Sequence, residues 1–387
     1  MKIICCVIDS FGIGAAPDSA EYGDAGANTA VHIGEAVGGV RWPNLMRLGL
    51  GNCVSLLGGS IPGCPAVDNP EAAFAALEEI SKGKDTTTGH WELAGIVLKK
   101  AFRTFPEDYP SFPDEIISEF EYKTGRKILG NISASGVKII QELGDEHCGT
   151  GKPIVYTSSD SVFQIAAHED IIPVEELYRY CEIARGICDK YDIGRVIARP
   201  FSGKSGNYTR TERRHDYSIP LPGPSLLDHL RSFGIKTTAV GKIGDIFNMR
   251  GIDISYPDKG NKACLGRVLS DGFLGPGRNE FIFANLVDTD MLYGHRRDPQ
   301  GYHDSVAGTD CAIPLIIDKL EMADSIFITA DHGCDPTYKG SDHTREYAPL
   351  LVLTKGKPAA NLGIIKGFFG MSNYVCDLYK IPAFPGF

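Results

Sequence analysis

The sequence has no long apolar run, no long run of basic residues and no Cys-x-x-Cys pair. No segment approaches the roughly 18 uninterrupted apolar residues that a membrane-spanning helix needs, so we expect no membrane partner. Net charge is −10 and the basic residues form no long run. Nucleic-acid binding normally requires a clustered positive face, so that partner is not expected either. The 11 cysteines include no Cys-x-x-Cys pair, which favours buried free thiols over disulfides or a zinc ribbon.

A basic leader is also missing from the N-terminus, which opens directly on a strand-like run. Together with an ordinary composition of 43% apolar and 23% charged residues, this indicates a cytoplasmic enzyme. A chain of 387 residues exceeds the length at which a single core usually stops growing, so we expect two domains.

Short apolar runs alternate with helix-like segments along much of the chain. The first run, "MKIICCVIDS", has the continuous apolar character of a strand buried on both faces of a parallel sheet. Similar runs span Lys236 to Asp245, Phe281 to Asp290, Ser325 to Gly333 and Pro349 to Thr354. This alternation predicts an α/β fold with a doubly wound, mostly parallel sheet.

The middle of the chain has a different sequence pattern, which predicts amphipathic helices such as "DEIISEFEYKTG" and short strands such as "PIVYTSS". A Pro-rich segment beginning at Ser218 leads back into the alternating pattern. We therefore expect a discontinuous core, residues 1–100 and 219–387, with a smaller α/β cap, residues 101–218, inserted into it.

Three of the predicted strands end in residues that can bind a metal. Asp9 follows the first strand, Asp290 ends "FIFANLVDTD", and Asp331 with His332 ends "SIFITADHG". Ligands of such sheets bind beyond the carboxyl ends of the strands, so these side chains are expected to meet at one edge.

Two further histidines complete a plausible ligand set. His295 follows Asp290 by five residues, and His343 follows a glycine-rich loop. A lone aspartate after a strand is more often a turn or a helix cap than a ligand. Three carboxylates and three imidazoles at one edge are harder to explain that way, and they suit two manganese, zinc or iron ions.

Three consecutive threonines in "GKDTTTGHWE" raise a second question. Asp85 or a threonine can cap a helix that starts near Gly89, with Glu92 as a capping-box partner. Alternatively, one threonine hydroxyl is a nucleophile, activated by the metals and by the N-terminus of the helix. The pattern alone does not distinguish the three threonines.

Basic residues that can bind anions lie mostly in the inserted segment. The planar guanidinium of arginine suits phosphate. The candidates are Arg195, Arg199, Arg210, Arg213, Arg214 and Lys242. Asp160, next to a predicted strand of the cap, can accept hydrogen bonds from a sugar or cap a helix.

Seven motifs in one order resemble the phosphopentomutase family of the alkaline phosphatase superfamily. They are "VIDSFGIGAAPD", "GKDTTTGHWE", "YTSSDSVFQIAAHE", "GRVIARPF", "RHDY", "LVDTDMLYGHRRDPQGY" and "ITADHG…DHTREYAPLL". The likeness extends to about Leu353. Cys334 stands where the family more often has asparagine, at a position that is not a ligand, and the chain ends in an unusual "IPAFPGF" to which the resemblance assigns no function.

The resemblance implies that ribose 1-phosphate and ribose 5-phosphate, and the deoxyribose pair, are interconverted in nucleoside salvage through a phosphorylated Thr86. It implies two Mn²⁺ ions, one held by Asp290, His295 and His343 and the other by Asp9, Asp331, His332 and the Thr86 oxygen. It also implies ribose 1,5-bisphosphate or glucose 1,6-bisphosphate as activator. The implied sugar- and phosphate-binding positions are Ser158, Asp160, Val162, Arg195 and Ile197, with Arg210 and Lys242 at the distal phosphate.

Three alternatives remain at this stage. A phosphatase or phosphodiesterase of the same superfamily would use the same metals and pass the phosphoryl group to water. A phosphoglycerate mutase normally uses serine and a different insertion. A non-catalytic sugar-phosphate or metal-binding protein is disfavoured, because Thr86 and all six expected ligands are present.

Overall fold

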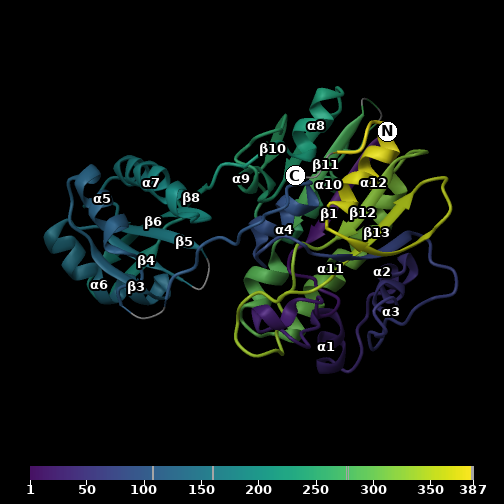
Figure 1. Ribbon diagram of the computed structural model, residues 1–387, viewed down its shortest axis with the longest axis horizontal. Helices are drawn as coiled ribbons and strands as arrows, with labels where there is room; N and C mark the ends of the chain where they lie inside the picture. Colours follow the sequence, from purple (N-terminus) through teal and green to yellow (C-terminus); the bar gives the residue numbers. More distant parts are fainter. Residues whose placement is uncertain (107–108, 159–160, 276, 278, 385–387) are drawn as a thin grey trace. The chain divides into compact units, whose positions relative to one another are not determined.

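The computed structural model describes residues 1–106, 109–158, 161–275, 277 and 279–384 (Figure 1). Contacts divide the chain into two compact units. Residues 1–100 and 222–387 form one, the core unit, and residues 101–221 form the other, the cap unit. The predicted fold class, a doubly wound α/β core with a smaller inserted α/β unit, is confirmed.

The core unit is built on an eight-stranded sheet in the order β10-β9-β11-β1-β12-β13-β2-β14. Its strands are β1 (Lys2–Ile8), β2 (Ala73–Glu78), β9 (Lys236–Val240), β10 (Ile254–Tyr256), β11 (Glu280–Leu286), β12 (Ser325–Thr329), β13 (Ala348–Thr354) and β14 (Asn361–Lys366). Only β13 runs antiparallel to its neighbours in this sheet of described residues. Central strands such as β1, sequence "KIICCVI", are buried along their whole length.

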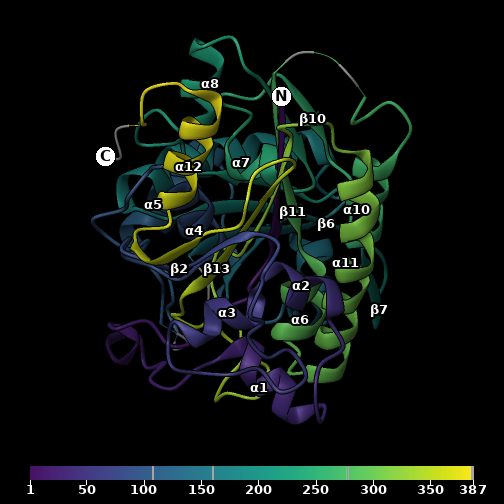
Figure 2. The same cartoon turned by 90° about the vertical axis from the view of Figure 1, so that its right-hand side faces the viewer.

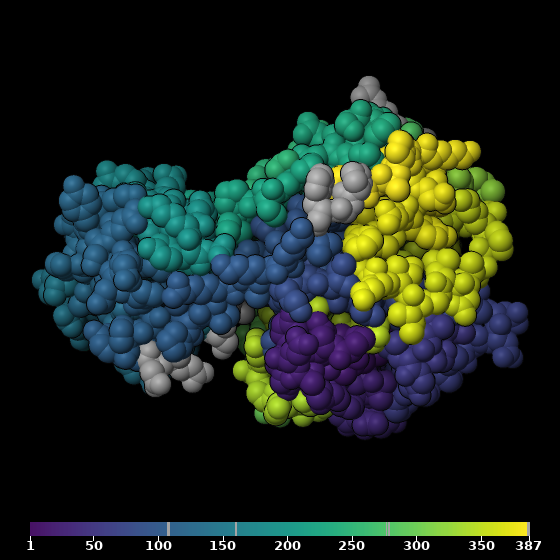
Figure 3. Space-filling view, in the orientation of Figure 1, coloured from purple at the N-terminus to yellow at the C-terminus, as the bar shows by residue number. Residues whose placement is uncertain are grey.

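Helices cover both faces of this sheet, as a doubly wound fold requires. Figure 2 shows α10 and α11 along one face and α4 and α12 against the other. The helices of the core unit are α1 (Thr29–Ala36), α2 (Pro43–Leu48), α3 (Leu50–Ser55), α4 (Thr86–Leu93), α8 (Leu226–Ser232), α9 (Ile243–Ile246), α10 (Asn261–Leu269), α11 (Pro299–Lys319) and α12 (Gly370–Tyr379). Residues of β14 and α12, in yellow, lie on the outer surface of the unit (Figure 3).

Register between three central strands decides which side chains meet at the carboxyl edge. Parallel pairing runs from Lys2 beside Glu280 to Ile8 beside Leu286, and β12 pairs with β1 on the other side. All three strands therefore end at the same level. The residues that follow them are brought together there, although they come from segments far apart in the sequence.

The cap unit has its own six-stranded sheet and its own core. Strands β3 (Leu129–Ser133), β4 (Ile154–Thr157), β5 (Val162–His168), β6 (Arg195–Lys204) and β7 (Asn207–Arg210) lie in sequence order, and β8 (His215–Ser218) pairs with β6. Its helices are α5 (Asp114–Thr124), α6 (Gly136–Thr150) and α7 (Val174–Cys188). A cluster that includes Phe112, Phe120, Phe163 and Leu177 fills one side of the sheet.

No helix in the described part of the chain combines the length and the apolar character that crossing a bilayer requires.

Helix α4 starts three residues earlier than the sequence analysis placed it, at Thr86 instead of near Gly89. Glu92 does not act as its capping-box partner. The buried carboxylate accepts backbone hydrogen bonds from Ile80 at 3.0 Å, Ser81 at 2.6 Å and Phe368 at 2.8 Å. Glu92 thus joins α4 to the chain after β2 and to the segment before α12.

Replacing Glu92 with glutamine should weaken this junction. A glutamine keeps one acceptor oxygen and directs an amide N–H at backbone donors, so we expect a loss of about 2–3 kcal/mol in the free energy of unfolding. Denaturant unfolding at fixed metal concentration measures it. Glu35→Gln, at an exposed position of α1, is the matched control and should change stability by less than about 0.5 kcal/mol. Equal effects of the two substitutions would contradict this role.

Candidate active site

The structure distinguishes the three threonines at the start of α4. Asp85 is the N-cap, and its Oδ1 accepts hydrogen bonds from the backbone N–H groups of Thr87 and Thr88. The Thr88 hydroxyl donates to the other Asp85 oxygen at 2.5 Å, and Thr87 is buried. Thr86 is half-exposed at the first position of the helix, with its Oγ1 3.2 Å from His332 Nε2. Its hydroxyl is therefore the one directed at the histidine and aspartate cluster.

The two residues after the threonines fix α4 against the end of β12. A Cβ atom on Gly89 would lie 1.8 Å from the backbone oxygen of Asp331, so no other residue fits without moving helix or strand. His90 is fully buried, and its Nδ1 hydrogen-bonds the Thr86 carbonyl at 2.9 Å and lies 3.0 Å from Asp331 Oδ2. Sequence reasoning missed both roles, although "GH" directly after the threonines was the available signal.

Arg345 holds the loop that leads into α4. Its guanidinium is completely buried and donates to the carbonyl oxygens of Glu79 and Gly83, each at 2.8 Å. It also forms a two-point ion pair with Asp18, both distances being 3.0 Å. A planar five-donor group suits this task, because lysine cannot serve several fixed acceptors at once. Arg345 lies in the motif "DHTREYAPLL", but no pattern in the sequence singles it out.

Asp9, Asp331 and His332 form the first potential ligand group, with one potential donor atom from each within 4.8 Å of the others. Asn285 donates to Asp9 Oδ2 at 2.9 Å, and the backbone N–H of Ser10 donates to Asp331 Oδ1 at 3.0 Å. The remaining oxygens, Asp9 Oδ1 and Asp331 Oδ2, are buried and accept no hydrogen bond from the described residues. Such orphaned carboxylate oxygens are costly unless a cation satisfies them.

A second group consists of Asp290, His332 and His343, all buried. Asp290 lies in a π-helical turn, Thr289–Gly294 (η3), which follows β11, and His295 is the C-cap of this turn. Single π-helical turns recur at functional sites because they re-aim side chains. The Nε2 atoms of His295 and His343 lie 3.1 Å apart, and each is 3.4 Å from an oxygen of Asp290.

Backbone carbonyls set the orientation of two of these imidazoles. His295 Nδ1 lies 2.6 Å from the oxygen of Ser341, and His332 Nδ1 lies 3.0 Å from that of Gly333. When Nδ1–H donates to a carbonyl, Nε2 is left as the lone-pair donor that a metal ion requires.

Electrostatics show which charge the cluster favours. Burial opposes ionisation of Asp290, yet the imidazoles of His343 and His295 hold the pKa of its carboxyl well below the usual range. Burial likewise opposes protonation of His332, but Asp331 and Asp9 raise the pKa of its imidazole well above the usual value. The Asp290 carboxyl thus stays ionised and attracts positive charge. This donor set of carboxylate oxygen and imidazole nitrogen fits divalent metal ions.

Cys334 lies closer to this centre than the sequence analysis supposed. Its sulfur belongs to a possible ligand group with Asp290 and His295. Burial raises the pKa of the Cys334 thiol, which donates to the carbonyl of Asp342 at 3.7 Å. A protonated thiol is a poor ligand, so the carboxylate and imidazole groups remain the better candidates.

The predicted substrate-binding residues divide between the two units. Lys242 is the N-cap of α9 in the core unit, directly after β9. In the cap unit Val162 pairs with Arg195 across β5 and β6, and Ile197 lies two residues further along the same face. Ser158 directly follows β4, and Asp160 lies outside the described residues.

Arginines gather on and beside that face of the cap sheet. Arg199 donates to Gln164 at 3.1 Å, and burial together with Arg214 lowers the pKa of its guanidinium to about 10. The buried Nε of Arg210 has no hydrogen-bond partner among the described residues. Arg214 forms a two-point ion pair with Asp216, and Arg213 pairs with Glu169. Arg210 thus keeps a buried N–H group available for an external anion among the described residues.

Comparison with known proteins agrees with this geometry. A family model described as the metalloenzyme superfamily matches residues 1–373. A phosphopentomutase of Clostridium kluyveri is 48% identical over 382 residues, covering 98% of this chain and 96% of that protein. One of Kosmotoga olearia is 49% identical, with the same coverage of both chains. One of Thermotoga petrophila is 48% identical over 387 residues, covering 99% of this chain and 96% of that protein.

A solved structure supports the fold alone. The PH0037 protein of Pyrococcus horikoshii is 13% identical, covers 98% of this chain and 96% of its own, and superimposes with a TM-score of 0.51. The curated relatives carry the family assignment, because their similarity extends over nearly the full length. The chain belongs to the phosphopentomutase family within the metalloenzyme superfamily, and it is an isomerase that transfers a phosphoryl group.

Proposed function

We propose that this enzyme interconverts ribose 1-phosphate and ribose 5-phosphate, and the corresponding 2-deoxyribose phosphates, through a phosphorylated Thr86. The supporting observation is the Thr86 hydroxyl at the N-terminus of α4, 3.2 Å from His332 and beside the buried aspartates. In the cell we place the reaction in nucleoside and pentose salvage in the cytoplasm.

The reaction begins with phosphorylated Thr86 and a pentose monophosphate. The free hydroxyl of the sugar attacks phosphorus, the bond from phosphorus to the Thr86 oxygen breaks, and a 1,5-bisphosphate forms. After the bisphosphate is reoriented or rebound, Thr86 takes the other phosphoryl group. An initial phosphorylation by ribose 1,5-bisphosphate or glucose 1,6-bisphosphate supplies the phosphothreonine.

Two Mn²⁺ ions, when bound, would neutralise the phosphoryl oxygens and lower the pKa of the threonine hydroxyl. Asp290, His295 and His343 would hold one, and Asp9, Asp331 and His332 the other. The chain's own residues position the reaction: Asp85 and His90 fix the start of α4, and the N-terminal end of this helix dipole favours negative charge at Thr86.

We assign seven residues to substrate binding, as the resemblance implies. We assign Ser158, Asp160, Val162, Arg195 and Ile197 to the sugar and its near phosphate, and Arg210 and Lys242 to the distal phosphate. Arginine at these positions suits the dianionic phosphate.

One assay tests the proposed reaction directly. The purified enzyme, with manganese, ribose 5-phosphate and glucose 1,6-bisphosphate, should produce ribose 1-phosphate with little release of inorganic phosphate. Stoichiometric phosphate release without isomerised sugar would instead identify a hydrolase.

Thr86→Val should lower the mutase rate by at least about 10³-fold, because it removes the nucleophile and keeps the side-chain volume. Mass spectrometry after treatment with the bisphosphate should find a phosphopeptide in the wild type that the variant lacks. Thr87→Val is the control, since that side chain is buried beside the same helix turn. A Thr86→Val enzyme with full activity would refute the proposal.

Removing one carboxylate should weaken metal binding. Manganese at about 100 times its Kd should stabilise the wild type by about 2.7 kcal/mol per site, and Asp290→Asn should lose much of this gain. Isothermal calorimetry and thermal unfolding with and without manganese measure it. Asp271→Asn, at a fully exposed position with the same change of charge, should respond like the wild type. Equal manganese affinity in all three proteins would rule out Asp290 as a ligand.

A further inference from the structure

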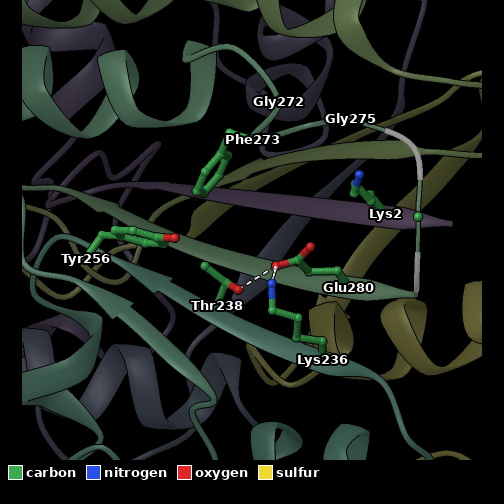
Figure 4. Close-up of a pocket in the computed structure, with 9 residues that line it drawn as sticks. Lys2, Lys236, Thr238, Tyr256, Gly272, Phe273, Gly275 and Glu280 are labelled. Carbon is green, nitrogen blue, oxygen red and sulfur yellow. Dashed lines mark hydrogen bonds and ion pairs between the residues drawn. The ribbon is translucent and has the colours of Figure 1, made fainter.

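A cavity of about 400 Å³ opens at the edge of the core sheet opposite to the aspartates and histidines. It lies at the amino ends of β1, β9 and β11, whose other ends lead to the catalytic edge. Figure 4 shows its lining, with Lys2, Lys236, Thr238 and Glu280 on the strands and Phe273 and Tyr256 facing them. The proposed mechanism uses none of these residues.

Strand register places one carboxylate between two lysines. Glu280 pairs with Lys2 on β1 and with Lys236 on β9, so the three side chains project from the same face of the sheet. The Glu280 carboxylate is already engaged, because Lys236 Nζ donates to its Oε1 at 2.8 Å and the Thr238 hydroxyl donates to the same oxygen at 2.5 Å. Lys2 is left over.

Within the described part of the chain, the ammonium group of Lys2 has no ion-pair or hydrogen-bond partner, although only 7% of the residue is exposed. The nearby carboxylate of Asp324 accepts the backbone N–H groups of Lys2 and Glu321. In Figure 4 the Lys2 nitrogen points away from Glu280, toward the loop at Gly275. The Lys2 side chain lines the cavity with its ammonium group unpaired among the described residues, so an anionic group in the cavity can bind to it.

An aromatic wall faces the lysines. The rings of Phe273 and Tyr256 meet edge to face, with their centroids 5.7 Å apart. The Arg267 guanidinium lies 4.6 Å from the Tyr256 ring centroid and forms an ion pair with Asp258. The Tyr256 hydroxyl points along the cavity toward Thr238 (Figure 4). Apolar ring surface beside a single uncompensated cation matches a ligand with one flat ring and one negative group.

We propose that this cavity binds a small organic anion, a carboxylate or phosphate monoester that carries one planar ring. The anionic group lies at Lys2, and the ring packs against Phe273 and Tyr256. The site is separate from the phosphoryl-transfer centre and does not rest on the proposed function.

Affinity measurements on the manganese-loaded, full-length enzyme test this. Benzoate, its neutral counterpart benzamide, and phenyl phosphate are titrated by ligand-observed NMR and calorimetry. We expect benzoate to bind at least tenfold tighter than benzamide, and Lys2→Met to abolish this preference. The ratio of the Kd values for benzoate and phenyl phosphate shows whether the site favours carboxylate or phosphate.

Lys366→Met provides the matched control, since it makes the same charge change on the exposed edge strand β14. Phe273→Leu is a second variant that leaves the charges intact and should weaken benzoate and benzamide alike. Equal affinities for benzoate and benzamide, no binding of either anion, or an equal loss in Lys366→Met would overturn the proposal.

Discussion

Uncompensated negative charge at the carboxyl edge of the core sheet is the constraint on which the active-site architecture depends. Asp9, Asp290 and Asp331 are buried, and each carries one oxygen without a hydrogen-bond donor among the described residues. Three such groups repel one another and lose their hydration, so the fold must supply compensation. Imidazole nitrogens 3.3–3.4 Å away supply part of it. Divalent cations would supply the rest, which couples the stability of this edge to its chemistry.

The arrangement of the helix and loop around Thr86 serves the same edge. Asp85 uses one oxygen for two backbone N–H groups and the other for the Thr88 hydroxyl. Arg345 fixes the loop before α4 through hydrogen bonds to the carbonyl oxygens of Glu79 and Gly83. Of the three threonines, only Thr86 is both partly exposed and within hydrogen-bonding distance of His332. The capping role and the proposed nucleophilic role, which looked like alternatives in the sequence, therefore fall to adjacent residues.

Much of the core sheet could be predicted from the pattern of apolar and acidic residues in the sequence. Continuous apolar runs predicted β1, β9, β11, β12 and β13, and the acidic residues after three of them predicted the common edge. Antiparallel pairing of β13 and the π-helical turn at Asp290 were not predictable, because both depend on contacts between distant segments. The resemblance to a family, and not the pattern, selected Thr86 in advance.

Residues that act through geometry rather than through charge were missed. Gly89 has no chemical function of its own, and its importance is visible only once the Asp331 backbone lies against it. His90 and Arg345 look like ordinary polar residues in the sequence, because their partners are backbone carbonyls and buried carboxylates from other segments. Lys2 belongs to the same class, because only the structure shows that the neighbouring Glu280 carboxylate binds Lys236 and Thr238 instead.

Contact between Gly89 and the Asp331 carbonyl also limits how this catalyst can vary. A hydroxyl whose position is set by a side-chain rotamer can be retuned by repacking its neighbours. Here the distance between α4, which carries the proposed nucleophile, and the end of β12, which carries proposed metal ligands, is set by main chain packed against main chain at Gly89. Substitutions around the site can change what the enzyme binds, whereas this spacing changes only if α4 or β12 moves as a whole.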